Sequence, residues 1–463
     1  MLKRFTAGRV PDPGVEELFS IEARWQAWLE VEAALAQAQA ELGLVTSECA
    51  EAIASACDIE SLDLERIRSG VDRMSHPFMP LVVELSRVVG EPHCDWVHWG
   101  ATTQNMTQTG DVRIIRKAHR LLLGLLGQVM GVMATLADQG AEMVMAGRTH
   151  GQHAVPITFG FKVAGWIDEM GRHVTRMREV EPRLFVALVG GAAGTFASWG
   201  EQGPEMQRRV ANRLGLAPMS VASRSVVDQF AELVCVLGLL GATCGKIARE
   251  VYILMKTEYG EVEEPVPTGT VGSSTMPQKR NPQLCQDILG ISAELRALVP
   301  LALEAVQSEH EADHTPTVLF ETIARAMTLS GDALVRARVI LGGLRLNPGR
   351  MRSNLALSEG MIMAEAVMLE LGRTIGRQRA HDVVFDATQA AASQGVSFVE
   401  LLASDPRVAP HLNQDEIEAM LDPGIHTGLS ASIAREQAEI ARRLAAEVCA
   451  YCDAAPGIEV RAR

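Results

Sequence analysis

The side chains best suited to chemistry gather in three short polar segments. The first runs from Thr268 to Pro282 and reads TGTVGSSTMPQKRNP. In it, Gly272 permits unusual backbone angles, Ser273 offers a hydroxyl group and Lys279 carries a positive charge. Consecutive N–H groups of such a loop can form a nest that binds an anion. Long polar connections in compact domains are usually functional or disordered. The segment is therefore either an anion-handling loop or a mobile linker.

The second segment, from Gly147 to Gln152, reads GRTHGQ and is followed by His153. It lies between two helical patterns, so we expect the chain to bend there. His150 is a candidate acid or base, because the pKa of a histidine can be tuned near neutrality by its surroundings. A purely structural histidine is the alternative interpretation.

The third segment, from Trp96 to Thr109, reads WVHWGATTQNMTQT and precedes a helix that we expect to begin near Asp111. Small hydroxyl and amide side chains cluster in this segment. Thr102, Thr103 and Gln104 could donate hydrogen bonds to a carboxylate. An ordinary helix N-cap would use the same residue types, since Ser, Thr and Asn favour that position.

Helical periodicity dominates the elements that must position these segments. Ile21 to Leu42 is rich in Ala, Leu and Glu with apolar residues three and four apart, and Gly43 follows as a stop signal. The stretch from about Gln229 to Tyr259 has some 31 residues, about 46 Å of helix, which predicts a long bundle. Alternating β-branched runs are few, so the sequence predicts an all-α fold. The other helical patterns cover about 111–143, 158–184, 203–214, 226–258, 284–306, 317–344 and 361–376.

Clusters of proline and glycine interrupt the predicted helices and suggest three domains. We expect an N-terminal helical domain over 1–108, a central long-helix bundle over 109–352 and a smaller C-terminal helical domain over 353–463. In the last domain, shorter helices are broken by Gly395, Pro406, Pro410 and Pro423.

Composition excludes several classes of protein. The 463 residues carry a formal charge of −14. That acidic balance argues against a nucleic-acid partner, which requires a basic face, but not against a local basic pocket for a small anion. The most apolar run, Leu121 to Ala137, is broken by Gln128 and is shorter than the roughly 20 residues of a membrane span. We expect a soluble, cytoplasmic protein with no membrane partner.

The eight cysteines are scattered, unlike those of a secreted disulfide scaffold. Cys449 and Cys452 form a C-x-x-C pair with no second pair to complete a four-ligand zinc site. We therefore expect two small residues one turn apart on a helix, and no metal site.

Together the three segments resemble the signature regions of the fumarase/aspartase superfamily. GSSTMPQKRNP at 272–282 is similar to the GSSxMPxKxNP signature. GRTHGQ and HWGATTQ resemble the other two regions in the form used by adenylosuccinate lyases and their relatives. FSIEARWQAWLEVEAALAQAQAELG, SHPFMPLVVEL (75–85) and GRQRAHDVV (376–384) are most similar to the branch that contains 3-carboxy-cis,cis-muconate cycloisomerases and adenylosuccinate-lyase-like proteins.

The resemblance implies a homotetramer built round long helices, with each active site assembled from the three regions of three subunits. It also implies reversible β-elimination from a succinyl group, releasing fumarate, with no metal or cofactor. Ser273 would be the base, as an alkoxide held by loop N–H groups and Lys279. His150 would assist the leaving nitrogen, and Glu311 would pair with that histidine and raise its pKa. The implied substrate-binding residues are His76, Thr102, Thr103, Gln104, Thr149, Gln152, Ser274, Met276, Lys279 and Asn281.

Departures from the family pattern narrow the expected reaction. Cycloisomerases of this branch carry Trp where His150 stands, which argues against lactone formation. Adenylosuccinate lyases carry an Arg- and Ser-rich stretch after the glutamate, whereas this chain has Ala312 and no arginine until Arg325. Asn105 replaces the usual aspartate after ATTQ. We therefore expect a C–N lyase acting on an N-substituted aspartate, with a cycloisomerase or adenylosuccinate lyase proper as alternatives.

Overall fold

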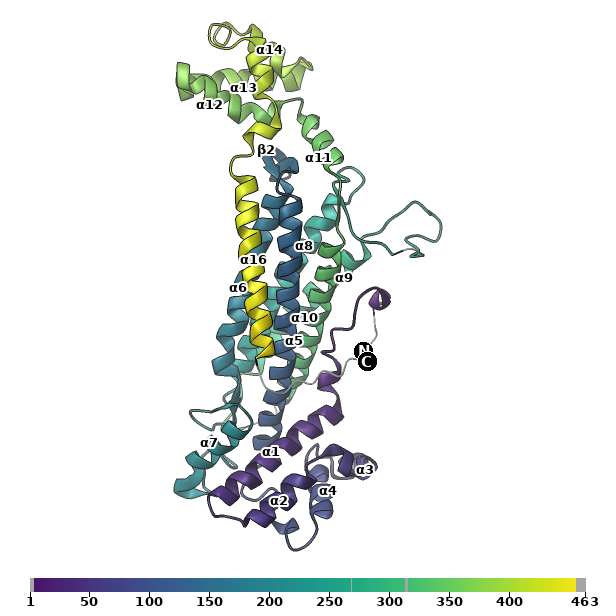
Figure 1. The fold of residues 1–463 in the computed structure, drawn as a ribbon, viewed down its shortest axis with the longest axis vertical. Coiled ribbons are helices and arrows are strands. Elements are labelled where there is room, and N and C mark those ends of the chain that lie inside the picture. Colours follow the sequence, from purple (N-terminus) through teal and green to yellow (C-terminus); the bar gives the residue numbers. More distant parts are fainter. Residues whose placement is uncertain (1–3, 268, 313–314, 455–463) are drawn as a thin grey trace.

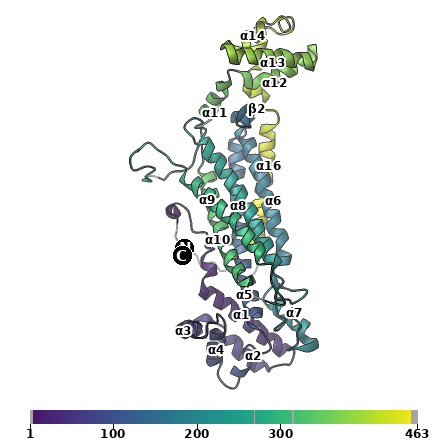
Figure 2. The ribbon, with the colours of Figure 1, turned by 180° about the vertical axis from the view of Figure 1, so that it is seen from behind.

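The computed structural model describes residues 4–267, 269–312 and 315–454 of the chain. Over these residues the fold is built from sixteen α-helices, with only three small two-stranded sheets. The predicted all-α class is thus confirmed. Figures 1 and 2 show an elongated molecule with a central bundle of long helices and a smaller helical part at each end.

Six long helices form the central bundle. All six contribute buried side chains to one large hydrophobic core, and α16 packs along α5 and α6. Their apolar residues recur at helical spacing, so each helix buries a broad stripe against its neighbours. The six are α5 (Thr103–Gln139), α6 (Phe159–Leu184), α8 (Asp228–Leu254), α9 (Gln283–Glu304), α10 (Thr315–Gly342) and α16 (Ser430–Asp453).

Two helices, α5 and α8, are long and apolar enough to cross a membrane by length and composition alone. The most apolar windows of α5 and α8 are 56% and 72% buried inside the fold. A position in the core of a bundle accounts for that composition, because a helix surrounded by other helices is apolar on most sides.

The N-terminal part begins with α1, which matches the predicted helix closely. The Ser20 hydroxyl accepts the N–H of Ala23 at 3.2 Å, and Gly43 follows the helix with a positive φ of 71°. The helices of this end of the molecule are α1 (Ile21–Glu41), α2 (Ser47–Ala56), α3 (Leu64–Met74), α4 (Met79–Val89) and α7 (Gly203–Arg213).

The C-terminal part has its own hydrophobic cluster, which includes Val367, Leu371, Val383 and Phe398. Its helices are α11 (Pro348–Leu355), α12 (Ala364–Ile375), α13 (Arg377–Gln394), α14 (Phe398–Ser404) and α15 (Gln414–Met420). The three-domain division stays a prediction. The division between residues 108 and 109 falls inside α5, and α16 packs on the bundle although its residues were placed in the C-terminal domain.

Three details of local structure differ from the sequence-based expectation. The bend expected at 147–152 is the turn of a β-hairpin. The helix expected near Asp111 begins eight residues earlier, at Thr103, because the Asn105 side chain accepts the N–H of Thr102 at 3.3 Å and so stabilises an earlier helix start. The stretch expected to be helical to Tyr259 ends at Leu254, and Gly260 takes a positive φ in the turn that follows.

The remaining elements are short. The strands are β1 (Val144–Thr149), β2 (Gln152–Thr158), β3 (Val186–Ala187), β4 (Ala217–Pro218), β5 (Val262–Glu263) and β6 (Arg345–Leu346), paired β1–β2, β3–β4 and β5–β6. The single-turn 3-10 helices are Ala7–Arg9, Glu17–Phe19, Ile59–Ser61, Cys94–Trp96, Gly200–Gln202, Ala356–Ser358, Met361–Met363 and Pro423–His426.

Candidate active site

A cavity of about 510 Å³ lies where α5 begins. Four of the predicted substrate-binding residues line it together: His76, Thr102, Thr103 and Gln104. The first turns of α10 close one side with apolar side chains, among them Phe320. A single chain therefore brings together residues that are close to 250 positions apart in sequence.

His76 is held in one orientation by the start of α4. Its Nδ1 accepts the N–H groups of Phe78 at 3.2 Å and Met79 at 2.9 Å. In a neutral imidazole the other nitrogen then carries the proton. His76 thus offers an Nε2–H donor at the cavity wall, which suits a substrate carboxylate or carbonyl.

Gln104 is already engaged within the chain. Its Oε1 accepts from the Arg224 Nε at 2.8 Å, and its Nε2 donates to the Arg224 carbonyl at 2.8 Å. Gln104 therefore holds the 223–225 loop against the cavity instead of leaving its amide free for substrate. Arg224 itself lines the cavity and was missed by the sequence analysis; an arginine between two serines in a loop was the only signal available.

An ion pair at the cavity was also missed by the sequence analysis. The Arg24 guanidinium binds both carboxylate oxygens of Asp111, at 2.9 and 2.7 Å, and lies 3.5 Å from the centroid of the Phe320 ring. Burial raises the pKa of Asp111, and Arg24 opposes that rise. Trp28 donates its indole N–H to the same carboxylate at 3.1 Å. The sequence offered no local signal for this pair, because arginines and a lysine follow Asp111 closely in α5.

His150 lies at the tip of the β1–β2 hairpin. Thr149 pairs with Gln152, so His150 and Gly151 form a two-residue turn in which both have positive φ, 53° and 77°. This is the geometry of the tight turns that suit the twist of a hairpin. All four of these residues are exposed, so the imidazole is presented to whatever faces the hairpin.

The strand residue just before this turn is fixed by a buried carboxylate. Glu261 receives two hydrogen bonds from Arg148, at 3.1 and 2.6 Å, and one from the Asn354 Nδ2 at 2.7 Å. The Glu261 side chain is fully buried. A bidentate, charge-assisted pair of this kind sets orientation as well as stability, so the position of His150 depends on a contact two residues before it.

Ser273 lies on a long loop that projects from the side of the bundle before α9 (Figure 1). Its Oγ accepts the N–H of Met276 at 3.1 Å and lies 3.4 Å from the N of Thr275. Both N–H groups direct partial positive charge at the hydroxyl oxygen, and Ser273 is itself only partly exposed. Two N–H groups of the loop therefore point at the Ser273 oxygen, and the anion-binding nest stays a prediction.

The two arms of the loop meet at Gly272. The Asn281 Nδ2 donates to the Gly272 carbonyl at 2.6 Å, and a Cβ at Gly272 would lie 2.1 Å from the Lys279 carbonyl oxygen. Asn281, predicted to hold a substrate carboxylate, thus uses one N–H to close the loop. Ser274, Met276 and Lys279 are exposed on the outer part of the loop, where they can contact only something beyond this chain.

The cavity and the hairpin of His150 lie far apart in one chain. Helix α5 has 37 residues, about 55 Å at 1.5 Å per residue, and separates Thr103 at its start from the hairpin that carries His150. Glu311 precedes α10, whose first turns line the cavity and whose far end leads to the strand beside Glu261. Glu311 and His150 are therefore about 40 Å apart along this helix, and one chain does not pair them.

Within residues 4–267, 269–312 and 315–454, no group of three or more His, Cys, Asp or Glu side chains is placed so that it could hold a metal ion. Cys449 and Cys452 both lie on α16, and the Cys452 sulfur contacts the Arg120 carbonyl at 3.6 Å.

Comparisons with known proteins place these features in context. A family model described as "Lyase" matches residues 8–296, and one described as "Adenylosuccinate lyase C-terminus" matches 360–436. The chain is 37% identical over 419 residues to the N-acetyl-S-(2-succino)cysteine lyase of Dickeya dadantii, covering 90% of this chain and 92% of that protein. It is 33% identical over 432 residues to the adenylosuccinate lyase of Methanocaldococcus jannaschii, covering 92% and 94%.

Among solved structures, the fold is similar to the 3-carboxy-cis,cis-muconate lactonizing enzyme of Pseudomonas putida. The TM-score is 0.87 at 32% identity, with 96% of this chain and 100% of that chain covered.

Proposed function

This chain belongs to the fumarase/aspartase superfamily, in its adenylosuccinate-lyase-like branch, and from that premise we propose that it is a fumarate-releasing lyase. The proposed substrate is a succinyl compound whose leaving group is joined through nitrogen or sulfur. A nitrogen leaving group is expected from the resemblance of the signature residues to those of C–N lyases. A sulfur leaving group is included because the Dickeya dadantii relative is named N-acetyl-S-(2-succino)cysteine lyase.

In the proposed reaction, Ser273 as an alkoxide takes the proton from the carbon beside a carboxylate. The electron pair of that C–H bond becomes the double bond of fumarate. The bond from the neighbouring carbon to nitrogen or sulfur breaks, and its electron pair leaves with the heteroatom, which takes a proton from His150. The intermediate carries extra charge on its carboxylate, which Lys279 and loop N–H groups would stabilise.

The observation that carries the proposal is the environment of the Ser273 oxygen. A serine hydroxyl is a very weak acid in water, so a base of this kind needs donors aimed at its oxygen. The N–H of Met276 is 3.1 Å from that oxygen, and the N–H of Thr275 lies beside it. These donors favour the ionised form over the neutral one, which supports Ser273 as the base.

A shared active site would unite the cavity and the hairpin of His150, which one chain holds about 55 Å apart. We propose that the protein assembles as a homotetramer in which His150, Ser273 and the cavity with His76 come from different subunits. Exposed apolar residues on the bundle support such an assembly: Leu239 on α8 is 53% exposed and Leu301 on α9 is 43% exposed. Glu311 would then reach His150 of a neighbouring copy.

The cavity lining favours a small substrate over a nucleotide. Its two arginines are both occupied, Arg24 by Asp111 and Arg224 by Gln104 and the Ala192 carbonyl at 2.6 Å. A phosphate requires unpaired cations or a cluster of N–H donors. Ala312, where the nucleotide-binding relatives carry arginine, fits the same interpretation.

The proposal is tested by offering the purified protein three kinds of compound. These are N-acetyl-S-(2-succino)cysteine, small N-substituted aspartates and 3-carboxy-cis,cis-muconate, with fumarate followed by its ultraviolet absorbance. Fumarate from a succinyl compound supports the proposal. Lactone from the muconate, with no fumarate from any succinyl compound, would replace it with the cycloisomerase activity.

The role of Ser273 is tested with Ser273→Ala, which should lower kcat at least about a hundredfold, as expected for loss of a proton-transfer group. Ser393→Ala is the matched control. It removes an exposed hydroxyl on α13 that bonds only to the carbonyls of Gln389 and Ala390, so its kcat should equal that of the wild type. Wild-type turnover by Ser273→Ala would remove Ser273 as the base.

A further inference from the structure

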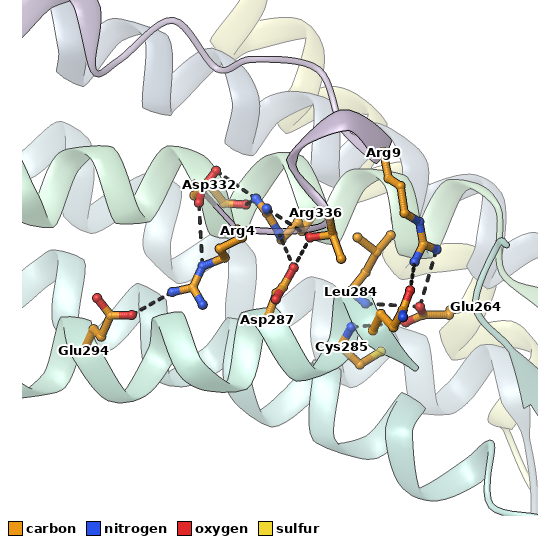
Figure 3. Close-up of polar contacts among 11 residues, drawn as sticks. Arg4, Arg9, Glu264, Leu284, Cys285, Asp287, Glu294, Asp332 and Arg336 are labelled. Atoms are coloured by element: carbon orange, nitrogen blue, oxygen red, sulfur yellow. Dashed lines mark hydrogen bonds and ion pairs between the residues drawn. The ribbon is translucent and has the colours of Figure 1, made fainter. Parts of the chain in front are cut away.

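An N-terminal strap, which we define as residues 4–16, crosses α9 and α10 and is tied to both by charged contacts (Figure 3). Arg4 binds Glu294 at 2.6 Å, and Thr6 bonds to Asp287. The buried Arg336 of α10 in turn contacts Asp287 at 3.2 Å. The strap is therefore fixed to the bundle by its first residues, which precede the residue that contacts the loop of Ser273.

Arg9, further along the strap, contacts both ends of that loop. One of its guanidinium nitrogens donates to the Pro265 carbonyl at 2.8 Å, and another donates to the Gln283 Oε1 at 2.8 Å. Pro265 lies before the loop and Gln283 is the first residue of α9 after it. One planar cation thus joins the point where the loop leaves the bundle to the point where it returns.

Glu264 lies beneath this junction with no exposed side-chain area. Its two carboxylate oxygens accept the N–H groups of Leu284 and Cys285, each at 3.1 Å, and so cap α9. Arg9 approaches the same carboxylate at 3.6 Å (Figure 3). A carboxylate at a helix N-terminus is stabilised by the free N–H groups there, and the buried charge is matched by Arg9.

Neighbouring carboxylates of the same short segment hold the hairpin and the loop. Glu261 binds Arg148 below the hairpin of His150, and Glu263 binds Arg280 of the loop at 2.8 Å. Residues 261–264 therefore connect the hairpin, the loop and the strap through three acidic side chains. A displacement of the strap would reach the loop through this segment.

We propose that Arg9 is a positioning residue for the loop: by joining Pro265 to Gln283 it sets the distance between the loop ends and so the placement of Ser273. The inference rests on the proposed function only for the role of Ser273; the mechanical link itself does not depend on the reaction. Arg9 contacts Pro265, Gln283 and Glu264, so it acts through the loop.

The competing explanation is that Arg9 serves only as the counter-charge of Glu264. Arg9→Lys separates the two, because lysine keeps the positive charge but lacks the fork that reaches two acceptors at once. Arg4→Lys is the matched control, since it makes the same chemical change in the same strap, at a residue whose recorded ion pairs are with Glu294 and Asp332.

The loop itself supplies a readout that is independent of activity. Lys279 and Arg280 are exposed, so trypsin can cleave the full-length protein there whenever the loop opens. We expect Arg9→Lys to be cleaved at these sites about tenfold faster than the wild type, the scale set by losing a charge-assisted hydrogen bond. Arg4→Lys should be cleaved at the wild-type rate, and the thermal unfolding midpoint of Arg9→Lys should stay close to that of the wild type.

Kinetics provide the second readout, with the compound that the wild type converts. Arg9→Lys should lower kcat more than it changes KM, because the base is displaced. Loop cleavage of Arg9→Lys at the wild-type rate, or equal acceleration in Arg4→Lys, would overturn the inference. If the wild type forms fumarate from no compound, the proposed function fails while the cleavage rates still decide the role of Arg9.

Discussion

Gly272→Ala is the perturbation whose effect the structure defines most sharply. The added Cβ would lie 2.1 Å from the Lys279 carbonyl oxygen, whereas ordinary contact begins at 3.4 Å. The two arms of the loop must therefore separate by roughly 1 Å, with Ser273 on the displaced arm. A misplacement of about 1 Å at a reacting group can lower the rate about a hundredfold. We expect kcat/KM to fall by about that factor.

Stability should hardly change in the same variant, because this loop lies outside the hydrophobic core. Steady-state kinetics and thermal unfolding of the purified protein measure the two effects separately. Gly131→Ala is the control: it lies within α5 and has nothing within 4 Å of the new Cβ, so activity should persist and stability should rise by up to about 1 kcal/mol. Wild-type kcat/KM in Gly272→Ala would refute the claim that the crossing of the two arms places Ser273.

Three further changes test the surrounding structure. Glu261→Gln leaves the Arg148 guanidinium without its buried partner, so we expect a loss of about 3 kcal/mol in unfolding free energy together with a lower kcat; an unchanged denaturation midpoint would contradict this. Burial lowers the pKa of His119 to about 4, whereas an unfolded histidine binds its proton near pH 6.5. The folded state is therefore destabilised as pH falls from about 6.5 to 4, by about 3 kcal/mol at the lower end, and His119→Gln should show a flatter dependence of the unfolding midpoint on pH than the wild type. Arg224→Met removes the partner of Gln104 at the cavity, so KM should rise several-fold, as expected for loss of one charge-assisted hydrogen bond, with little change in the unfolding midpoint; an unchanged KM would show that the loop does not shape the cavity.

Local patterns were enough to predict most of the fold. Helix α1 has the expected apolar spacing, a serine cap at Ser20 and a glycine stop at Gly43, all of which act within a few residues. The start of α5 was placed too late because its first residues are polar, as residues of a loop usually are. The capping contact between Asn105 and Thr102, which stabilises the earlier start, is seen only in the structure. The hairpin at His150 was missed because its strands are short and only partly apolar.

Ser273 and His150 were singled out by residue type and by resemblance to the family signature, and their catalytic roles stay predictions. Positions that act by pairing were not predictable. Arg24 and Asp111 are 87 residues apart, Gln104 and Arg224 are 120 apart, and Arg9 lies 256 residues from Pro265. Such pairs depend on how whole helices pack, and a periodic pattern does not specify which partners meet.

We propose that Ser273 and His150 act in one site although different subunits supply them. The most direct measurement mixes Ser273→Ala and His150→Gln proteins, each expected to be inactive alone, under conditions that allow subunits to exchange. Sites that combine an intact loop from one chain with an intact hairpin from another should then form fumarate, so activity should appear on mixing. Hybrid tetramers that are verified by mass spectrometry and still form no fumarate would contradict a shared site of Ser273 and His150 from different subunits.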